Sequence, residues 1–461
     1  MNTLPQTLLL QEGGSIAQDA KPGYIYHTFE VRPGIAALRV RLSYRKEGVC
    51  QLYLSVFGPD GYRGTRMKPG EVGEVELELT FGAGGASLGA LAGAIEPGTW
   101  RILLDLERTH HATEYALSVE ASLEPISFPS PPPAAAQNGR PGAGWYRGEL
   151  HSHSHHSDGR TAVEDVVSAA RRYGLDFLAL TDHYTTAGWS ELRSLAGPGL
   201  CVMTGSELTG HGGHANLHGL SEWVNPFVDG DGWTVNDAAQ ATHAQGGLFC
   251  VNHAFSLDLG WRYHRFDWRQ ADLIEIYHHL EGSANTPQLT LWDSLLRQGL
   301  RVTGVAGTDS HDPYSGQHRL GQVFTYVYAE ALDSRAILAA LKAGRAYVSL
   351  GPRLEFSATS NGRPVGMGES LEAGTEVRLE AKLSDLAFPA RVLLMKNGFY
   401  HAHKDIAAGR DSLKLQFSDE DGRTGDYYRL EVFALKPQGG DYSNGREWER
   451  TLLLSNPIFL T

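Results

Sequence analysis

The middle of the chain, from about residue 145 to 350, alternates short apolar runs with helical stretches, and this pattern constrains the fold most strongly. Alternation of strand and helix indicates a mostly parallel sheet, here an incomplete or distorted barrel of seven strands. The expected strands cover residues 146–151, 175–183, 201–207, 215–220, 248–253, 272–277 and 301–309. The sequence therefore predicts an α/β fold for this segment.

Side chains that can bind divalent metal ions lie at the ends of these expected strands. In His151-Ser152-His153 the two imidazoles are two residues apart and so point to the same face of a strand. The later candidates are His183, Glu207, His214, His218, His253, Asp309 and His311, and Asp158 follows the first pair in a Ser-Asp-Gly turn. Because active sites of parallel α/β folds form at the carboxyl ends of strands, we expect these side chains to meet in one pocket.

The number and type of these side chains indicate a site for more than one ion. Most of the 20 histidines fall within residues 145–350, and a purely structural role would require a separate partner for each buried imidazole. A set of about nine groups suits two or three divalent cations, with a carboxylate such as Glu207 bridging two of them. Imidazole and carboxylate without thiolate fit Zn²⁺, Mn²⁺ or Fe²⁺.

Composition and charge exclude several other classes of protein. The 461 residues exceed one ordinary hydrophobic core, and the net charge of −13 opposes general binding to nucleic acid. Three distant cysteines, Cys50, Cys201 and Cys250, predict neither a disulfide framework nor a thiolate zinc site. No apolar run reaches the length of a membrane span or of a signal core, so we expect a cytoplasmic protein that does not enter the membrane.

Two flanking segments alternate apolar and polar residues with period two. Residues 1–127 and 352–461 both show this pattern, with Gly and Pro between the runs, and each is predicted to form an all-β sandwich. Residues 128–144 are rich in proline and alanine and are predicted to form a linker. The expected organisation is thus a distorted (β/α)7 barrel over residues 145–351 between two sandwiches.

Local signals predict the ends of two helices in the middle segment. Thr161 and Glu164 have the spacing of a capping box, and Gly174 is placed to end the same helix. Pro287 is expected at the first position of the helix that precedes the last strand, where its missing N–H costs nothing.

The order of the polar motifs resembles the PHP family of metal-dependent hydrolases. The motifs are His151-Ser152-His153 with Ser157-Asp158-Gly159, then Thr181-Asp182-His183, Gly205-Ser206-Glu207, Asn252-His253 and Gly307-Thr308-Asp309-Ser310-His311. That family has a distorted seven-stranded β/α barrel, and many of its members are phosphoesterases. Residues 213–216 and 343–352 are similar to the CehA/McbA-type branch, which is named for hydrolases of an aryl carbamate.

The resemblance implies three metal sites. The first would be held by His151, His153, Glu207 and Asp309, and Glu207 would bridge to a second site held by His253 and a histidine near residue 214. The third, which only some family members have, would be held by Asp158, His183 and His311. For the second site, the run Gly213-His214-Ala215-Asn216 favours His214 and the strand end favours His218; we choose His214.

A rival resemblance is the amidohydrolase superfamily, because a His-x-His pair also opens its β/α barrels. Many of its binuclear members use a carboxylated lysine as the bridge. Residues 145–350 contain a single lysine, Lys342, which falls in an expected helix after the last ligand strand. This position disfavours the lysine-bridged class.

The predicted function is metal-dependent hydrolysis of a small-molecule ester, with a hydroxide that bridges two ions as the nucleophile. A phosphate mono- or diester is the expected substrate, a carbamate or carboxylic ester is the alternative, and a non-catalytic, metal-stabilised binding protein is a third hypothesis. Candidate residues for substrate contact or support of the ligands are His155, His156, Tyr184, Arg262, His264, Arg265, His318 and Arg319. The sequence leaves open whether chains associate.

Overall fold

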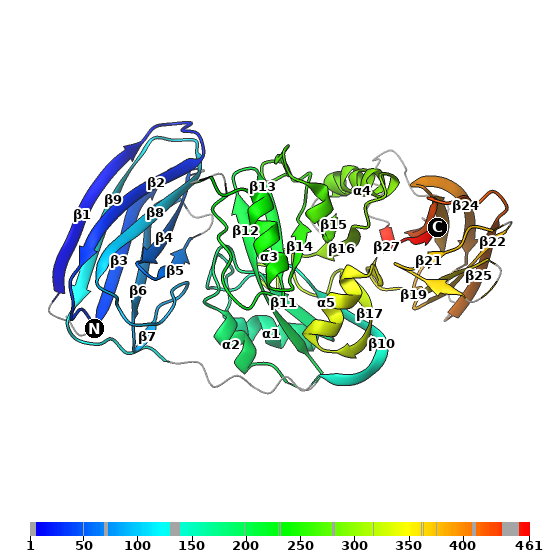
Figure 1. Ribbon diagram of the computed structural model, residues 1–461, viewed down its shortest axis with the longest axis horizontal. Coiled ribbons are helices and arrows are strands. Elements are labelled where there is room, and N and C mark those ends of the chain that lie inside the picture. Colours follow the sequence, from blue (N-terminus) through cyan, green and yellow to red (C-terminus); the bar gives the residue numbers. More distant parts are fainter. Residues whose placement is uncertain are drawn as a thin grey trace.

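Strands predominate in the protein, and they are arranged in three successive regions along its long axis (Figure 1). The computed structural model describes residues 6–48, 50–68, 72–129, 139–197, 199–228, 230, 232–278, 282–316, 318–360, 362, 364–374, 376–407, 412–435 and 451–461. An N-terminal β region lies at one end, the segment with most of the helices lies in the middle, and a C-terminal β region lies at the other end.

The N-terminal region consists of two antiparallel sheets that share one core. The first sheet has the order β1 (Gln6–Ile16), β9 (Thr113–Ser122), β3 (Ala37–Lys46), β6 (Gly73–Gly82) and β7 (Gly85–Ala86). The second has the order β2 (Gly23–Val31), β8 (Gly98–Thr109), β4 (Cys50–Gly58) and β5 (Gly61–Arg66). Val40 and Val119 of the first sheet and Leu54 and Trp100 of the second belong to the same buried cluster. The period-two pattern of the sequence produces this core, because alternate side chains of each strand face inward.

The middle segment contains a run of seven strands in one sheet. In order along the sheet these are β16 (Thr303–Gly307), β15 (Leu273–His278), β14 (Leu248–Val251), β13 (Gly213–His218), β12 (Cys201–Gly210), β11 (Phe177–Leu180) and β10 (Arg140–Glu149). Pairing is parallel within β10–β12 and within β14–β16, whereas β13 is antiparallel to both of its neighbours. β13 can be antiparallel because only two residues join it to β12, too few for a helical crossover.

The two ends of this run come together just beyond β10 and β16. Ser152 and Ser310 form a parallel bridge, in which the His153 N–H donates to the Ser310 carbonyl at 2.9 Å and the Ser310 N–H donates to the His151 carbonyl at 3.3 Å. The run therefore curls back on itself, and the segments that follow its first and last strands lie side by side.

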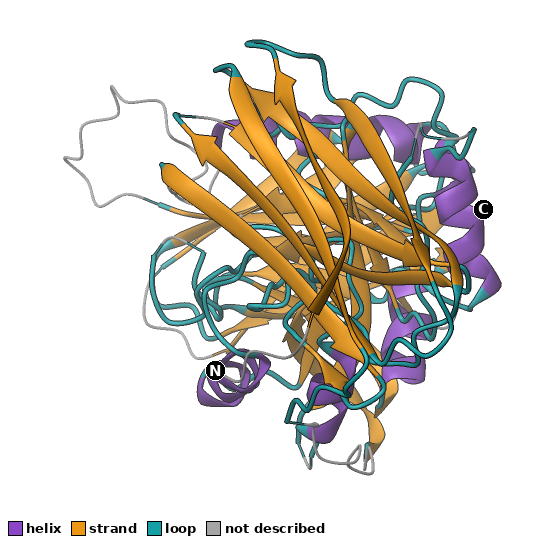
Figure 2. Ribbon diagram, turned by 90° about the vertical axis from the view of Figure 1, so that its left-hand side faces the viewer, coloured by secondary structure: helices purple, strands orange, loops and turns teal. Residues whose placement is uncertain are grey.

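The helices lie at the periphery of the molecule, around the strands, in the view of Figure 2. They are α1 (Val163–Arg172), α2 (Trp189–Ser194), α3 (Val235–Ala244), the short 3-10 helix η1 (Trp268–Gln270), α4 (Gly282–Arg297) and α5 (Ser334–Lys342). Among the described residues, none of the helices is both long and apolar enough to cross a lipid bilayer.

Two of the three predicted helix signals differ from the structure. The N-cap of α1 is Ala162 and carries no side-chain cap; the Thr161 hydroxyl is buried without a hydrogen-bond partner among the described residues, while the Thr161 carbonyl accepts the His155 N–H at 2.8 Å. α4 begins at Gly282, so Pro287 lies inside the helix rather than at its first position. The end of α1 is as predicted, since Gly174 has φ +69°, the conformation that glycine adopts most easily after a helix.

The sheet continues across the predicted boundary between the middle segment and the C-terminal region. Beyond β10 the order is β17 (Phe324–Leu332), β18 (Ala346–Ser349), β27 (Thr451–Ser455), β26 (Tyr427–Ala434), β23 (Ala390–Lys396) and β24 (Phe399–Ile406). A second sheet has the order β20 (Val365–Gly366), β19 (Arg353–Thr359), β22 (Val377–Ser384) and β25 (Ser412–Asp419), while β21 (Ser370–Leu371) pairs with β28 (Ile458–Leu460). The C-terminal region thus shares a sheet with the middle segment.

The predicted linker lies partly outside the described residues. Residues 130–138 are not described, and β10 already begins at Arg140, inside the segment 128–144. Pro141 can belong to this strand because the register with β17 shifts between Pro141 and Gly144, and such bulges tolerate a missing N–H.

A buried charge cluster joins α4 to β26. The Arg429 guanidinium donates to both carboxylate oxygens of Asp293, at 2.9 and 2.7 Å, and lies 2.6 Å from a Glu431 carboxylate oxygen. All three side chains are buried. Removing the cation would leave two carboxylates without their counter-charge in the interior.

We therefore predict that Arg429→Leu lowers the free energy of unfolding by about 3–5 kcal/mol. The measurement is chemical denaturation followed by circular dichroism, with Arg391→Leu as the control, because Arg391 makes a similar two-pronged contact to Asp405 at an exposed position. Equal effects of the two substitutions would contradict a special role for the buried cluster.

Candidate metal centre

All nine residues that the sequence predicts as metal ligands are brought into groups whose ligand atoms lie within 4.8 Å of one another. The groups are His151, His153, Glu207 and Asp309; Glu207, His214 and His253; and His153, Asp158, His183 and His311. They lie at the carboxyl ends of β10, β11, β14 and β16 and within β12 and β13. The structure therefore brings the side chains at these strand ends together.

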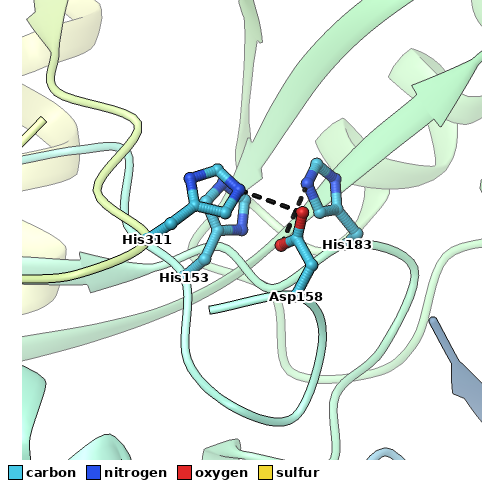
Figure 3. A group of neighbouring side chains, drawn as sticks. All are labelled: His153, Asp158, His183 and His311. Atoms are coloured by element: carbon cyan, nitrogen blue, oxygen red, sulfur yellow. Dashed lines mark hydrogen bonds and ion pairs between the residues drawn. The ribbon is translucent and has the colours of Figure 1, made fainter. Parts of the chain in front are cut away.

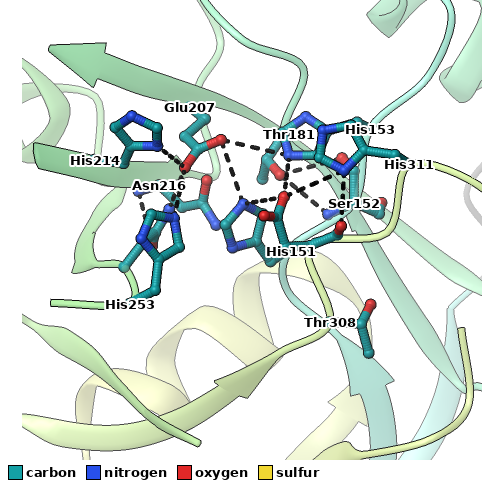
Figure 4. A network of polar contacts seen from close by, with 12 residues as sticks. His151, Ser152, His153, Thr181, Glu207, His214, Asn216, His253, Thr308 and His311 are labelled. Carbon is teal, nitrogen blue, oxygen red and sulfur yellow. Dashed lines mark hydrogen bonds and ion pairs between the residues drawn. The ribbon is translucent and has the colours of Figure 1, made fainter. Parts of the chain in front are cut away.

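Glu207 connects the first two groups, and its side chain is 0% exposed. Its Oε2 lies 3.3 Å from His151 Nε2 and 3.0 Å from His183 Nδ1, whereas its Oε1 lies 3.2 Å from His214 Nδ1 and 3.5 Å from His253 Nε2 (Figure 4). The two oxygens thus face different sets of imidazoles. Asn252 holds the carboxylate in this orientation, because its Nδ2 donates to Oε1 at 2.9 Å.

Asp158 is the centre of the third group. Its Oδ2 lies 3.0 Å from His311 Nε2 and its Oδ1 lies 3.4 Å from His183 Nε2 (Figure 3). The His153 and His183 rings are stacked with centroids 4.3 Å apart. A carboxylate and imidazoles from three separate segments of the chain therefore converge on one small volume.

The structure places His214, and not His218, in the second group. His218 is fully buried, and neither of its ring nitrogens has a hydrogen-bond partner among the described residues. Burial lowers the pKa of His218 to about 3, so its ring is neutral. His218 therefore behaves as an uncharged core residue within the strand run, whereas His214 faces Glu207.

The backbone is strained at two candidate ligands and beside a third. Asp309 has φ +52° and His253 has φ +24°, and Tyr184, which follows His183, has φ +62°. Residues other than glycine rarely adopt positive φ, and such strain is concentrated at functional sites, where the surrounding structure imposes it. Here it turns the side chains at the ends of β14 and β16 toward the pocket.

Two buried carboxylates that the sequence analysis did not single out support the ligands. Glu275 Oε1 lies 2.7 Å from His151 Nδ1, and its Oε2 accepts the His253 N–H at 2.8 Å. Glu149 accepts the backbone N–H of His151 at 3.0 Å and the Thr308 hydroxyl at 2.8 Å. Glu275 is the only acidic residue in the apolar strand β15, and that is the signal that could have identified it. Glu149 follows Arg147 and Gly148 in β10 and has no such signal.

The N-terminal region forms one wall of the site. Arg66, at the end of β5, donates to the His155 carbonyl at 2.7 Å, and the Gly89 N–H donates to His156 Nδ1 at 3.2 Å. Asp105 of β8 is buried; it accepts the Tyr184 hydroxyl at 2.9 Å and lies 2.6 Å from His211 Nε2. The loops that carry Asp158 and His183 are thus held from outside the middle segment.

The other residues predicted to contact substrate do not lie together. His318 lies near the pocket, with its Nδ1 2.9 Å from the Thr308 carbonyl and its ring centroid 6.4 Å from that of His311. Arg262 donates to the carbonyls of Asp258 and His211, at 2.9 and 2.8 Å. His264, Arg265 and Arg319 are exposed. His155 and His156 form a separate group with Glu191 beside the N-terminal wall.

The chemistry of the pocket suits divalent cations. Buried ring nitrogens of His151, His153 and His253, and Glu207 Oε2, have no hydrogen-bond partner among the described residues. Burial favours a protonated Glu207, but His151 and His183 outweigh it and hold its pKa well below the ordinary value. The pocket thus combines three carboxylates with imidazoles whose lone pairs are not otherwise used, and buried anions require compensating positive charge.

Comparison with known proteins identifies part of this segment. Residues 149–226 match the family model of the PHP domain. The match contains six of the candidate ligands, and the remaining ones, His253, Asp309 and His311, come from later strand ends. The comparison with curated proteins gives no match.

Solved structures show only distant likeness. A two-domain protein from Bacteroides vulgatus containing a predicted PHP-like metal-dependent phosphoesterase is 17% identical, with 72% of this chain and 100% of that chain covered and a TM-score of 0.40. An amidohydrolase from Chromobacterium violaceum is 16% identical over 36% of this chain and 88% of its own, with a TM-score of 0.28. These TM-scores are too low to assign a function. The assignment of this segment therefore depends on the PHP-domain match and on the geometry of the side chains.

We predict that Asp105→Ala lowers the thermal stability and the metal content of the protein, although Asp105 lies in the N-terminal region. The change removes the buried carboxylate that accepts the Tyr184 hydroxyl and lies 2.6 Å from His211 Nε2. The Tyr184 hydroxyl can still donate to the Thr209 carbonyl, so the expected cost is about 1–3 kcal/mol in total, mainly from the lost contact with His211. Thermal unfolding and metal content of the purified variant are the measurements. Asp60→Ala, an exposed carboxylate at the turn before β5, is the control and should match the wild type.

We also predict that metal uptake by the Asp158 group depends on pH. Burial alone would lower the pKa of His311, but Asp158 and Asp309 outweigh it and raise this pKa to about 9 in the ion-free protein. An imidazolium cannot coordinate, so ion affinity should rise from pH 6 to 9 with release of a proton. In the ion-free protein, the stabilisation from this raised pKa is complete below pH 6.5 and is lost as the pH rises through 9.

Calorimetric titration of the ion-free protein in buffers of different ionisation enthalpy measures the released protons. His311→Gln should release fewer protons and bind less metal. A proton count that is the same in wild type and variant would contradict this prediction.

Proposed function

We propose that the protein is a metal-dependent hydrolase that acts on small phosphate esters. The observation that carries this proposal is the position of Glu207, a fully buried carboxylate whose two oxygens face two different imidazole groups. A carboxylate in this position is suited to bridge two ions. The PHP-domain match of residues 149–226 supports the same class of enzyme.

The proposed ion sites follow the three groups of side chains. His151, His153, Glu207 and Asp309 would hold the first ion; Glu207, His214 and His253 the second; and Asp158, His183 and His311 the third. The curled run of seven strands would then be a PHP-type barrel between two β-sandwiches. Imidazole and carboxylate ligands suit Mn²⁺, Fe²⁺ or Zn²⁺.

Bound divalent ions would lower the pKa of a coordinated water and polarise the ester. The chain itself orients the ligands for this chemistry. Glu275 engages Nδ1 of His151, which leaves Nε2 directed at Glu207, and the Thr209 hydroxyl is hydrogen-bonded to His183 Nδ1. Asn252 keeps the Glu207 carboxylate from rotating. Such supporting contacts fix the orientation of metal ligands.

A phosphate ester is the favoured substrate because three ion sites can neutralise a multiply charged group. A carbamate or carboxylic ester is the second candidate. It is favoured by one observation, namely that the Arg262 guanidinium, a candidate substrate contact, already donates to the carbonyls of Asp258 and His211. An uncharged ester would need no such arginine.

The test is a substrate panel with the purified protein loaded with Mn²⁺, Fe²⁺ or Zn²⁺. The substrates are p-nitrophenyl phosphate, bis-p-nitrophenyl phosphate, p-nitrophenyl acetate and 1-naphthyl N-methylcarbamate. Turnover of a phosphate ester that is lost on chelation and restored by metal supports the proposal. Turnover of the acetate or carbamate alone supports the second candidate, and full metal content without turnover of any ester supports a binding protein.

We predict that Asp309→Ala lowers kcat/KM by at least about 100-fold and reduces bound metal, because even loss of a supporting contact to a ligand costs 10–100-fold. Activity and metal content per chain are measured on the same preparation. Asp312→Ala is the matched control, since Asp312 lies in the same loop but only caps the turn at Tyr314 and Ser315. A fully active, metal-replete Asp309→Ala protein would refute the site.

A further inference from the structure

His278, at the end of β15, is a buried histidine that none of the predicted ion sites includes. Its side chain is 3% exposed, and neither ring nitrogen makes a hydrogen bond within the described part of the chain. Its Nε2 lies 3.7 Å from Asp309 Oδ2, which is too long for a hydrogen bond. Buried polar groups nearly always have a partner, so the absence of one at the His278 ring requires an explanation.

A bulge in β15 turns His278 toward the pocket. Residues three apart in a regular strand point to opposite faces, so Glu275 and His278 would not ordinarily face the same side. The register between β15 and β16 shifts between Glu275 and Tyr277, and this extra residue brings both side chains to the inner face. Bulges commonly redirect side chains next to active sites.

The backbone of His278 is held firmly while its ring is left unbonded. Asn285 of α4 accepts the His278 N–H at 2.8 Å and donates to its carbonyl at 3.2 Å. Gln288 donates to the same Asn285 oxygen at 3.1 Å, and both amide side chains are buried. This support positions the imidazole without occupying its nitrogens.

We propose that His278 is an additional ligand of the ions that Glu207 bridges. Its ligand atom lies within 4.8 Å of those of His151 and His253, one from each of the two bridged groups. A further imidazole favours Zn²⁺, Fe²⁺ or Co²⁺ over Mg²⁺, which prefers oxygen ligands. This inference rests on the ion sites of the proposed function but does not depend on which ester is hydrolysed.

His218 provides a matched control within the same strand run. It is as buried as His278 and its ring is equally without hydrogen bonds, but it belongs to none of the groups of potential ligands in the described residues. The two histidines therefore do not differ in burial. They differ in their positions relative to His151 and His253.

The experiment compares His278→Ala, His278→Gln and His218→Ala with the wild type, all as full-length proteins. The readouts are Zn²⁺ affinity against a chromophoric chelator, metal content per chain, and the visible absorption of the Co²⁺-loaded protein. Both His278 variants should bind at least one ion about 10-fold or more weakly and show an altered Co²⁺ spectrum, whereas His218→Ala should bind as the wild type does. If His278→Ala does not fold, the same measurements on the volume-conserving His278→Gln variant test the proposal.

Unchanged Zn²⁺ affinity and an unchanged Co²⁺ spectrum in a folded His278 variant would overturn this inference, even if the wild type hydrolyses esters. A larger effect of His218→Ala on metal binding would also overturn it. Conversely, a wild type that binds ions but hydrolyses no ester would defeat the proposed function while leaving the role of His278 intact. The two failures are therefore distinguishable.

Discussion

The organisation of the pocket depends on one buried carboxylate surrounded by imidazoles. Glu207 is buried, and its two oxygens face one histidine in β13 and histidines that follow the ends of β10, β11 and β14. An anion in this position is costly unless positive charge or hydrogen-bond donors surround it. The curled run of strands supplies these donors, because it brings the ends of its strands to a single place.

The surrounding structure constrains the ligands from several directions. Glu275 and Glu149 hold His151 from within the strand run, and Asn285 of α4 holds the backbone of His278. Asp105 and Arg66 support the loops of Tyr184 and His155 from the N-terminal region. The N-terminal region is therefore a structural part of the candidate site, and Figure 1 shows its sheets next to the middle segment.

Much of the candidate site could be predicted because its residues follow short apolar runs that are visible locally. His183, Glu207 and Asp309 each follow or belong to an expected strand, and parallel strands expose their carboxyl ends at one edge. The choice between His214 and His218 could not be made in this way. They lie four residues apart on the same face of β13, and each is two residues from Asn216, the partner of Glu207 in the register with β12. Only the three-dimensional packing separates them, because it places His214 Nδ1 3.2 Å from Glu207 Oε1 and leaves both ring nitrogens of His218 without a hydrogen-bond partner among the described residues.

The amino-acid sequence alone specified the types of ligand, their order along the chain and the strand–helix alternation that brings them together, because each depends on a few neighbouring residues. Tertiary structure decided the rest. The bulge that turns His278 inward, the positive φ at His253 and Asp309, and the contact of Asp105 with Tyr184 all arise from packing between distant segments. Such contacts leave no periodic signal in the sequence, because their partners are separated by tens to hundreds of residues.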